Sequence, residues 1–232
     1  MNLVTTLTAK NLGNRKGAKV RGIVLHDTAG SRSKGDAEYL ANDPEDRGVS
    51  VDYVILMDGT VYQLNHTLET KYTNHAGRHT RWVSKQLVGP AINRGSVGIE
   101  ISQKAKIELV PDPKYPPAQV NAVAEVCAQL CKQFSLTKLD ITTHKDLITD
   151  GTRSDPRQFP WPQFWDRFNF HMGDSPQGGP SLGHITHTVV KGDTLYGLAQ
   201  KYNTKIEVIK ALNDMNTMSN VINEGQVLIV KE

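Results

Sequence analysis

A run rich in glycine, proline and serine divides this chain into two unequal parts. Residues 173–183 read Gly-Asp-Ser-Pro-Gln-Gly-Gly-Pro-Ser-Leu-Gly, which offers little that a folded core could bury. Such a composition is typical of a flexible linker. The sequence therefore predicts a first domain over residues 1–172, a linker over 173–185 and a second domain over 186–232. The first part is long enough for a core of its own, whereas the second is near the lower limit for independent folding.

The first part alternates short apolar runs with helical patterns. Its clearest helix is predicted over residues 117–134, where proline suits the first turn and apolar residues recur every three or four positions. Shorter helices are expected over 35–41 and 159–168. Strands are expected over 20–25, 51–57, 60–64, 97–101 and 139–143, with Asp58-Gly59 as a hairpin turn. This pattern predicts an α/β domain with a mixed central sheet flanked by helices.

The second part follows a β-α-α-β pattern. Apolar strands are expected at 187–190 and 226–230, and two short amphipathic helices at 195–202 and 204–212. Within this part five lysines balance five acids, so the small excess of positive charge in the whole chain lies before residue 186.

Charge and hydropathy exclude several classes of function. A net charge of +3 without a cluster of lysines and arginines gives no reason to expect nucleic acid, but it is compatible with an anionic cell-wall polymer. No apolar run approaches the ~18 residues that span a bilayer, so we expect no membrane insertion. The first ten residues lack a basic segment followed by an apolar block, so we expect synthesis in the cytoplasm without a secretory signal.

Cys127 and Cys131 lie four apart on the predicted helix and are interpreted as core side chains.

Three residues far apart in the chain offer the ligands of a catalytic zinc site. His144 follows a predicted strand, Asp155 lies on the loop after it, and His26 ends another apolar run. Catalytic zinc takes three such nitrogen and oxygen ligands and leaves a fourth position for water, whose pKa the metal lowers. Taken singly, each of these residues is more often an ordinary polar residue of the surface or core. The three are also far apart in the chain, so no local spacing enforces the site.

Two further residues could carry the chemistry. Glu100 stands between two isoleucines in Val97-Gly-Ile-Glu-Ile101, so in a strand its side chain lies on the opposite face from theirs. If that face lines the cleft, burial would raise the pKa of Glu100 into the range of a general base. The simpler interpretation is an exposed strand residue. Arg153 stands two residues before Asp155 and could stabilise an oxyanion, or it could be a solvated loop cation.

Four parts of the sequence resemble one enzyme family: His26, Asn74-His-Ala-Gly77, Val97-Gly-Ile-Glu-Ile101 and the stretch from His144 to Pro156. The family is that of the zinc-dependent type 2 N-acetylmuramoyl-L-alanine amidases. It shares its fold with peptidoglycan recognition proteins and includes phage endolysins. The resemblance covers roughly residues 20–168. It implies that His26, His144 and Asp155 hold Zn²⁺, that Glu100 is the catalytic base, and that Arg153 stands where the family often has an oxyanion-stabilising lysine.

The sequence departs from the family pattern at three places. Val51 and Asp52 stand where some members have a catalytic tyrosine followed by a strand histidine, so that tyrosine is absent and more of the chemistry falls on Glu100. Asn74 replaces a common tryptophan, and the adjacent His75 is expected to line the substrate cleft or to support a ligand from behind, without binding the metal itself. The loop from His144 to Asp155 is one residue longer than in some relatives, which bears on the placement of Arg153.

The tail resembles a LysM module, a fold that binds glycans containing N-acetylglucosamine in a shallow groove between two loops. The segments Val189-Val-Lys-Gly-Asp-Thr-Leu195 and Glu224-Gly-Gln-Val-Leu-Ile229 carry this likeness. By position, the groove would be formed by Gly192, Asp193, Thr194 and Leu195 on one side and by the stretch from Met218 to Ile222 on the other. A module for dimerisation or stability is the plainer alternative.

The sequence thus predicts a monomeric peptidoglycan hydrolase that cleaves the amide between N-acetylmuramic acid and L-alanine and is anchored to the wall by its tail. The missing secretory signal favours a phage or prophage endolysin that reaches the wall after release from the host cytoplasm. The alternative is a non-catalytic peptidoglycan-binding protein, which would be expected to have lost a ligand or the base.

Overall fold

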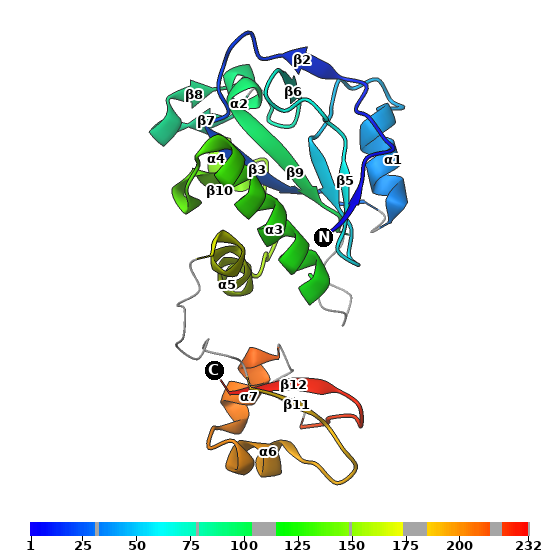
Figure 1. Ribbon diagram of the computed structural model, residues 1–232, viewed down its shortest axis with the longest axis vertical. Coiled ribbons are helices and arrows are strands. Elements are labelled where there is room, and N and C mark those ends of the chain that lie inside the picture. Colours follow the sequence, from blue (N-terminus) through cyan, green and yellow to red (C-terminus); the bar gives the residue numbers. More distant parts are fainter. Residues whose placement is uncertain are drawn as a thin grey trace. The chain divides into compact units, whose positions relative to one another are not determined.

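The computed structural model describes residues 1–30, 33–77, 79–103, 115–148, 150–173, 185–213 and 220–231. The chain forms two compact units, Met1–Asp174 and Ser175–Glu232 (Figure 1). Apart from Gly173 and Ile185, the predicted linker over 173–185 lies outside the described residues.

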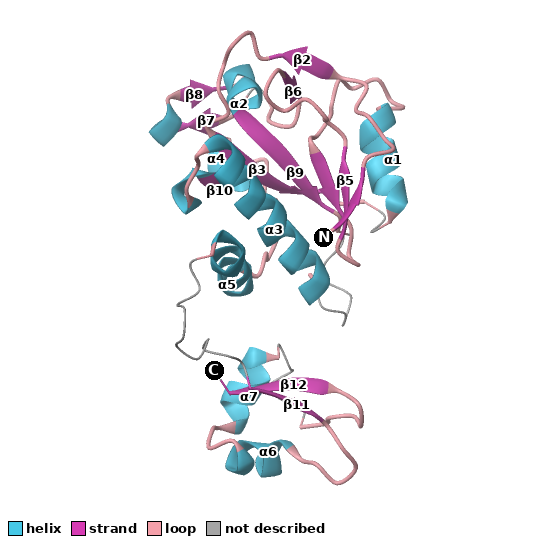
Figure 2. Ribbon diagram, in the orientation of Figure 1, coloured by secondary structure: helices cyan, strands magenta, loops and turns pink. Residues whose placement is uncertain are grey.

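A six-stranded sheet forms the centre of the first unit (Figure 2). Its order is β1-β5-β4-β9-β3-β10. The strands are β1 (Asn2–Val4), β3 (Gly22–Asp27), β4 (Tyr53–Ile55), β5 (Thr60–Gln63), β9 (Ser96–Ile101) and β10 (Ile141–Thr143). Strand β9 runs parallel to β3 and β4, β10 runs parallel to β3, and β1 runs parallel to β5. The β4–β5 hairpin is antiparallel, which confirms the predicted mixed sheet.

Two helices cover one face of this sheet. They are α3 (Pro117–Phe134) and α5 (Trp161–Met172), and α3 has the predicted bounds. The apolar side of α3 packs against alternate strand residues such as Leu25 and Ile99 in the largest core cluster. Cys127 and Cys131 are buried in this cluster as free thiols, as the helical spacing indicated.

The opposite face of the sheet carries smaller elements. Helix α1 (Lys34–Asn42) packs over one end through Ala37 and Ala41, while α2 (Pro90–Gly95) and α4 (His144–Leu147) contribute to another small cluster around Val24. Two short antiparallel pairs complete the unit: β2 (Leu12–Asn14) with β6 (Lys71–Thr73), and β7 (Arg81–Trp82) with β8 (Leu87–Val88). A 3-10 turn, η1 (Val83–Lys85), connects β7 to β8.

Several predicted strands are shorter than the apolar pattern indicated, among them the one expected over 51–57, which spans only Tyr53–Ile55. The segment expected as a strand from residue 139 begins as a 3-10 turn, η2 (Lys138–Asp140), and only then becomes β10. Thr137 and Asp140 explain this start, because each side chain accepts a hydrogen bond from the other residue's backbone N–H. The short strand still delivers His144 directly to the sheet edge.

The second unit has the predicted βααβ pattern. It contains β11 (Ile185–Thr188), α6 (Leu195–Lys201), α7 (Ile206–Leu212) and β12 (Val227–Lys231), and the two strands pair antiparallel. Its core consists of apolar side chains from both helices, β12 and the turn after β11, namely Val189, Leu195, Leu198, Ala199, Ile209, Leu228 and Val230. Across the described parts of both units, no helix has the length and hydropathy needed to cross a membrane.

Candidate active site

Three neighbouring parallel strands end at the same edge of the sheet, and each brings a polar side chain there. His26 and Asp27 end β3, Glu100 is the penultimate residue of β9, and His144 follows β10 directly. His26 and Glu100 are paired across the β3–β9 register. The carboxyl ends of parallel strands are the usual position of sites in such sheets.

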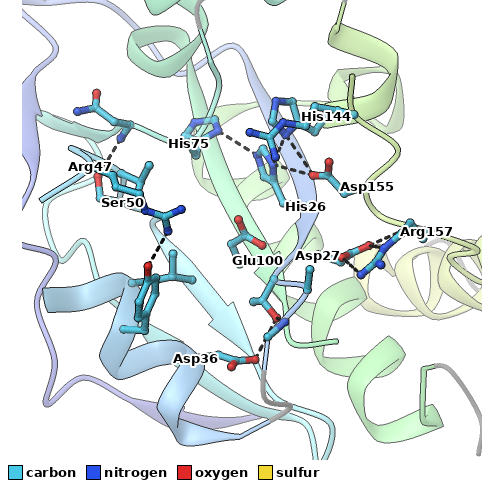
Figure 3. Close-up of a pocket in the computed structure, with 18 of the residues that line it drawn as sticks. His26, Asp27, Asp36, Arg47, Ser50, His75, Glu100, His144, Asp155 and Arg157 are labelled. Atoms are coloured by element: carbon cyan, nitrogen blue, oxygen red, sulfur yellow. Dashed lines mark hydrogen bonds and ion pairs between the residues drawn. The ribbon is translucent and has the colours of Figure 1, made fainter. Parts of the chain in front are cut away.

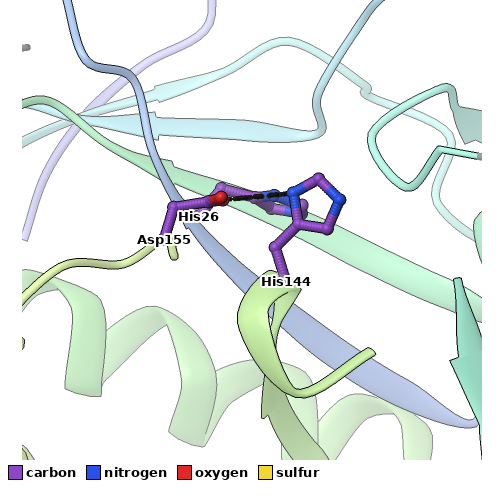
Figure 4. Close-up of side chains that lie close together, drawn as sticks. All are labelled: His26, His144 and Asp155. Atoms are coloured by element: carbon purple, nitrogen blue, oxygen red, sulfur yellow. Dashed lines mark hydrogen bonds and ion pairs between the residues drawn. The ribbon is translucent and has the colours of Figure 1, made fainter. Parts of the chain in front are cut away.

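The two predicted histidine ligands and Asp155 form one tight cluster (Figure 4). The Nδ1 atoms of His26 and His144 are 3.1 Å apart. The Oδ2 atom of Asp155 lies 3.1 Å from Nδ1 of His144 and 3.3 Å from Nδ1 of His26. Zinc bonds of about 2.0–2.1 Å in tetrahedral geometry place ligand atoms about 3.3 Å apart. The spacing and chemistry of these three atoms therefore fit a zinc ion.

The electrostatics of the cluster suit a cation. Burial lowers the pKa of His26, outweighing the opposite effect of Asp155. Burial alone would raise the pKa of Asp155, but hydrogen bonds and charge attraction from His144 and His26 hold it well below its ordinary value. A neutral imidazole and an ionised carboxylate are the forms in which these side chains bind metals.

The cluster lies in a pocket of about 850 Å³ that reaches from β3 and β9 to α1 (Figure 3). The lining includes every site residue that the sequence predicted for the first domain: His26, His75, Glu100, His144, Arg153 and Asp155. Arg153 is exposed on the loop before Asp155, whereas His26 and His144 are buried.

Glu100 points into this pocket, as strand alternation predicted (Figure 3). Its neighbours Ile99 and Ile101 belong to the core on the other face. Its Oε2 atom is buried and has no hydrogen-bond partner among the described residues. Burial, followed by repulsion from Asp155 and Asp27, raises the pKa of Glu100 well above its ordinary value. A buried carboxylate without a partner is costly to the fold, and such groups mark functional sites.

His75 lies behind His26 and outside the metal cluster. Its Nδ1 atom is 3.2 Å from Nε2 of His26, and its Nε2 atom is 3.2 Å from Oγ of Ser96. Burial lowers the pKa of His75 well below its ordinary value. Both ring nitrogens are thus in contact with protein groups.

Sequence reasoning missed the pair of Asp27 and Arg157 beside the cluster. The backbone N–H and the Nε–H of Arg157 both donate to Oδ2 of Asp27, at 2.8 and 3.0 Å, and Nη2 donates to Oδ1 at 2.6 Å. Asp27 follows His26 directly, and Arg157 stands two residues after Asp155. The pair therefore ties the loop that carries Asp155 to the strand that carries His26.

Comparison with known proteins decides the family. The profile of the N-acetylmuramoyl-L-alanine amidase family matches residues 16–158, more than half of the 232-residue chain. This chain belongs to that amidase family. A LysM profile matches residues 187–231, which lie within the second unit. None of the curated proteins matches the sequence.

Solved structures share the fold of the amidase domain. An AmpDh3 of Pseudomonas aeruginosa, in complex with anhydromuramic pentapeptide, has a TM-score of 0.52 at 23% identity, over 65% of this chain and 60% of that one. A mutant endolysin from Bacillus subtilis has a TM-score of 0.51 at 22% identity, over 75% and 99%. The N-acetylmuramoyl-L-alanine amidase LysC of Clostridium intestinale has a TM-score of 0.50 at 19% identity, over 73% and 98%. At these identities the likeness shows the fold alone.

In the LysM unit, the residues predicted for the first groove loop lie between β11 and α6. Gly192 is exposed with a φ of 97°, a backbone conformation that favours glycine. The carboxylate of Asp193 accepts the backbone N–H of Val190 and contacts Nε2 of His187 at 2.6 Å.

The remaining predicted groove residues are also engaged within the fold. The hydroxyl of Thr194 caps α6 by accepting from Gly197, and the side chain of Leu195 is buried in the core. On the second loop Ile222 packs partly buried against the same core, while Met218 and Ser219 lie outside the described residues.

Proposed function

We propose that this chain is a zinc-dependent N-acetylmuramoyl-L-alanine amidase that cleaves the amide between N-acetylmuramic acid and L-alanine of peptidoglycan. The observation that carries the proposal is the cluster of His26, His144 and Asp155 beside the unpartnered carboxylate of Glu100, in one pocket of an amidase-family domain. The muropeptide in the AmpDh3 structure supports this class of substrate.

His26, His144 and Asp155 are the residues that would hold the metal. Bound zinc would supply a Lewis acid that polarises the amide carbonyl and acidifies water. The protein contributes two buried imidazoles and a carboxylate that are already close enough to bind one ion, so little rearrangement is required.

Glu100 would act as the general base and then as the general acid. Its carboxylate takes a proton from the attacking water, whose oxygen forms the bond to the carbonyl carbon. The proton then passes from Glu100 to the nitrogen of L-alanine as the carbon–nitrogen bond breaks, which releases a free amine and a carboxylic acid. A raised pKa favours both steps because it makes Glu100 a stronger base and keeps its protonated form populated.

Arg153 would stabilise the negative charge that develops on the carbonyl oxygen. It lines the pocket on the loop that carries Asp155, and its side chain is exposed and so accessible to a substrate. A fixed cation near a developing oxyanion lowers the barrier to amide hydrolysis.

The LysM unit would hold the enzyme on the glycan strands of its substrate. Tethering raises the local concentration of amide bonds around the pocket without changing the chemistry. The arrangement favours a monomeric endolysin, of phage or prophage origin, that is made in the host cytoplasm and acts on the wall after release. The endolysin among the structural relatives supports this proposal.

Digestion of purified sacculi tests the activity. The protein should release intact stem peptides with a free L-alanine amino group, identified by mass spectrometry, and a chelator should abolish release until zinc is added back. Binding to sacculi without release of stem peptides, with or without zinc, would contradict the enzyme and favour a non-catalytic peptidoglycan-binding protein.

A further inference from the structure

His75 is the middle of a continuous chain of hydrogen bonds that leads away from the metal cluster. Nε2 of His26 lies 3.2 Å from Nδ1 of His75, and Nε2 of His75 lies 3.2 Å from Oγ of Ser96. The Ser96 hydroxyl in turn donates to the backbone carbonyl of Ile92 in α2, at 2.6 Å. The chain therefore ends on a group that can only accept.

This ending determines where each hydrogen lies. The single hydroxyl hydrogen of Ser96 is directed to Ile92, so its oxygen accepts from Nε2–H of His75. A neutral His75 then has a bare Nδ1, which accepts from Nε2–H of His26. His26 is left with a bare Nδ1, and this is the atom that faces His144 and Asp155.

His75 is held in place by its neighbours in the chain. The backbone N–H of Asn74 donates to Oγ of Ser50 at 2.9 Å, and that of Ala76 donates to Oδ1 of Asn93 at 2.7 Å. The ring itself lies directly over Gly98 of β9, where a Cβ atom would come within 2.4 Å of Cγ of His75. A glycine is therefore required beneath the ring.

One face of strand β9 thus carries three residues that shape the site. Ser96, Gly98 and Glu100 alternate onto the pocket side of the strand. Ser96 accepts from His75, Gly98 leaves room for its ring, and Glu100 reaches the pocket beyond. The Ser-Val-Gly-Ile-Glu segment from Ser96 to Glu100 therefore supports the cluster around His26 as well as the proposed base.

We propose that His75, held by Ser96, is a positioning residue that fixes His26 in the tautomer whose Nδ1 lone pair faces the metal. The inference rests on the proposed function, because it assigns the support of a zinc ligand. The two histidines of the cluster differ in this respect: within the described residues, Nε2 of His144 is buried without a hydrogen-bond partner. Partners of this kind orient metal-bound imidazoles and raise their basicity.

Zinc affinity of the full chain, measured by competition with a chromophoric chelator, gives the first test. His75→Phe fills the space without a nitrogen and should weaken zinc binding about 10- to 100-fold. His75→Gln keeps an acceptor for His26 and should recover part of this loss. His66→Phe is the matched control, because the His66 ring is exposed and contacts the carbonyl of Leu7. It should leave zinc affinity unchanged.

The tautomer itself gives a second readout that needs neither zinc nor activity. Long-range ¹H–¹⁵N spectra of the metal-free protein should show His26 protonated at Nε2 and bare at Nδ1. Ser96→Ala frees His75 to donate from Nδ1 instead, and should shift part of the His26 population to the other tautomer. This variant changes no residue of the pocket wall proposed to meet substrate, so it also decides the question if His75→Phe does not fold.

The outcomes separate the two proposals. Unchanged zinc affinity in folded His75→Phe, or His26 protonated at Nδ1 in the wild-type protein, would overturn the role of His75. Failure of the wild-type protein to bind zinc would overturn the proposed function, while the tautomer measurement would still report on the chain from His26 to Ser96.

Discussion

The Nδ1 atoms of His26 and His144 face each other at 3.1 Å. Two bare ring nitrogens repel at this distance, so in the metal-free protein one of them carries a hydrogen. Because Nε2 of His144 has no partner in the described structure while Nε2 of His26 has His75, the hydrogen belongs on Nδ1 of His144. A cation that replaces this hydrogen would satisfy both rings and Asp155 together.

Glu100→Gln should separate metal binding from turnover. The substitution keeps the size of the side chain but removes its ability to take a proton, so we expect zinc affinity close to wild type and a kcat about 10²- to 10⁴-fold lower. The measurements are chelator competition and the rate of stem-peptide release. Glu38→Gln, on the exposed side of α1, is the matched control and should retain full activity. An active Glu100→Gln enzyme would mean that another group is the base.

The same substitution should stabilise the metal-free protein in a pH-dependent way. The folded-state pKa of Glu100 is raised above its ordinary value of 4.5, so the folded state binds this proton more tightly than the unfolded chain. The protonated Glu100 side chain therefore contributes its full stabilisation below pH 4.5. This contribution is lost as the pH rises through the raised pKa of the folded state. Because Gln does not ionise, Glu100→Gln should match wild type in acid and unfold a few degrees higher at pH 8, in thermal melts with chelator. If Glu100→Gln and the wild-type protein melted at the same temperature at pH 8 as well as in acid, burial of the ionised Glu100 carboxylate would not destabilise the fold.

Removal of Arg157 should loosen the ligand loop. The Asp27 side chain is only 1% exposed, and Arg157→Ala leaves its carboxylate with the backbone N–H alone. We expect a loss of about 3 kcal/mol in unfolding free energy, the lower end for a broken buried ion pair, and weaker zinc binding. Lys10→Ala is the control, because the ion pair that Lys10 makes with Asp46 is exposed and should contribute at most about 1 kcal/mol. If the two variants lost equal stability, the Asp27–Arg157 pair would not be the support described above.

Deletion of the LysM unit should slow the hydrolysis of insoluble peptidoglycan but not that of a soluble substrate. The unit after residue 174 is compact and has its own core, so the amidase domain should remain folded without it. We expect unchanged hydrolysis of a soluble muramoyl pentapeptide and a loss of about 100-fold or more on sacculi at low enzyme concentration. The separated LysM unit, added in trans, should not restore the rate. Equal losses on both substrates would argue for a structural role of the tail.

Sequence reasoning placed the strands that end at this sheet edge, because local patterns carry that information. The apolar run that ends at His26 and the alternation around Glu100 identify the strands and the face on which each side chain lies. Helix α3 is long enough for its apolar repeat to recur several times, so the sequence pattern predicts where it begins and ends. Strands of two or three residues, such as β7 and β8, offer no period to read and were not predicted.

The supporting contacts lay beyond sequence reasoning for a different reason. Asp27 and Arg157 are 130 positions apart, and no spacing rule relates them. The sequence left two interpretations of His75, as a cleft residue or as a support for a ligand. The contact with Ser96, which favours the second interpretation, forms only once the fold has placed the ring over Gly98.

Anomalous diffraction at the zinc absorption edge, from crystals of the full chain grown with zinc, would locate the metal itself. We expect one strong peak within bonding distance of Nδ1 of His26, Nδ1 of His144 and the carboxylate of Asp155. No peak at this cluster, or zinc bound only at other residues, would contradict this expectation.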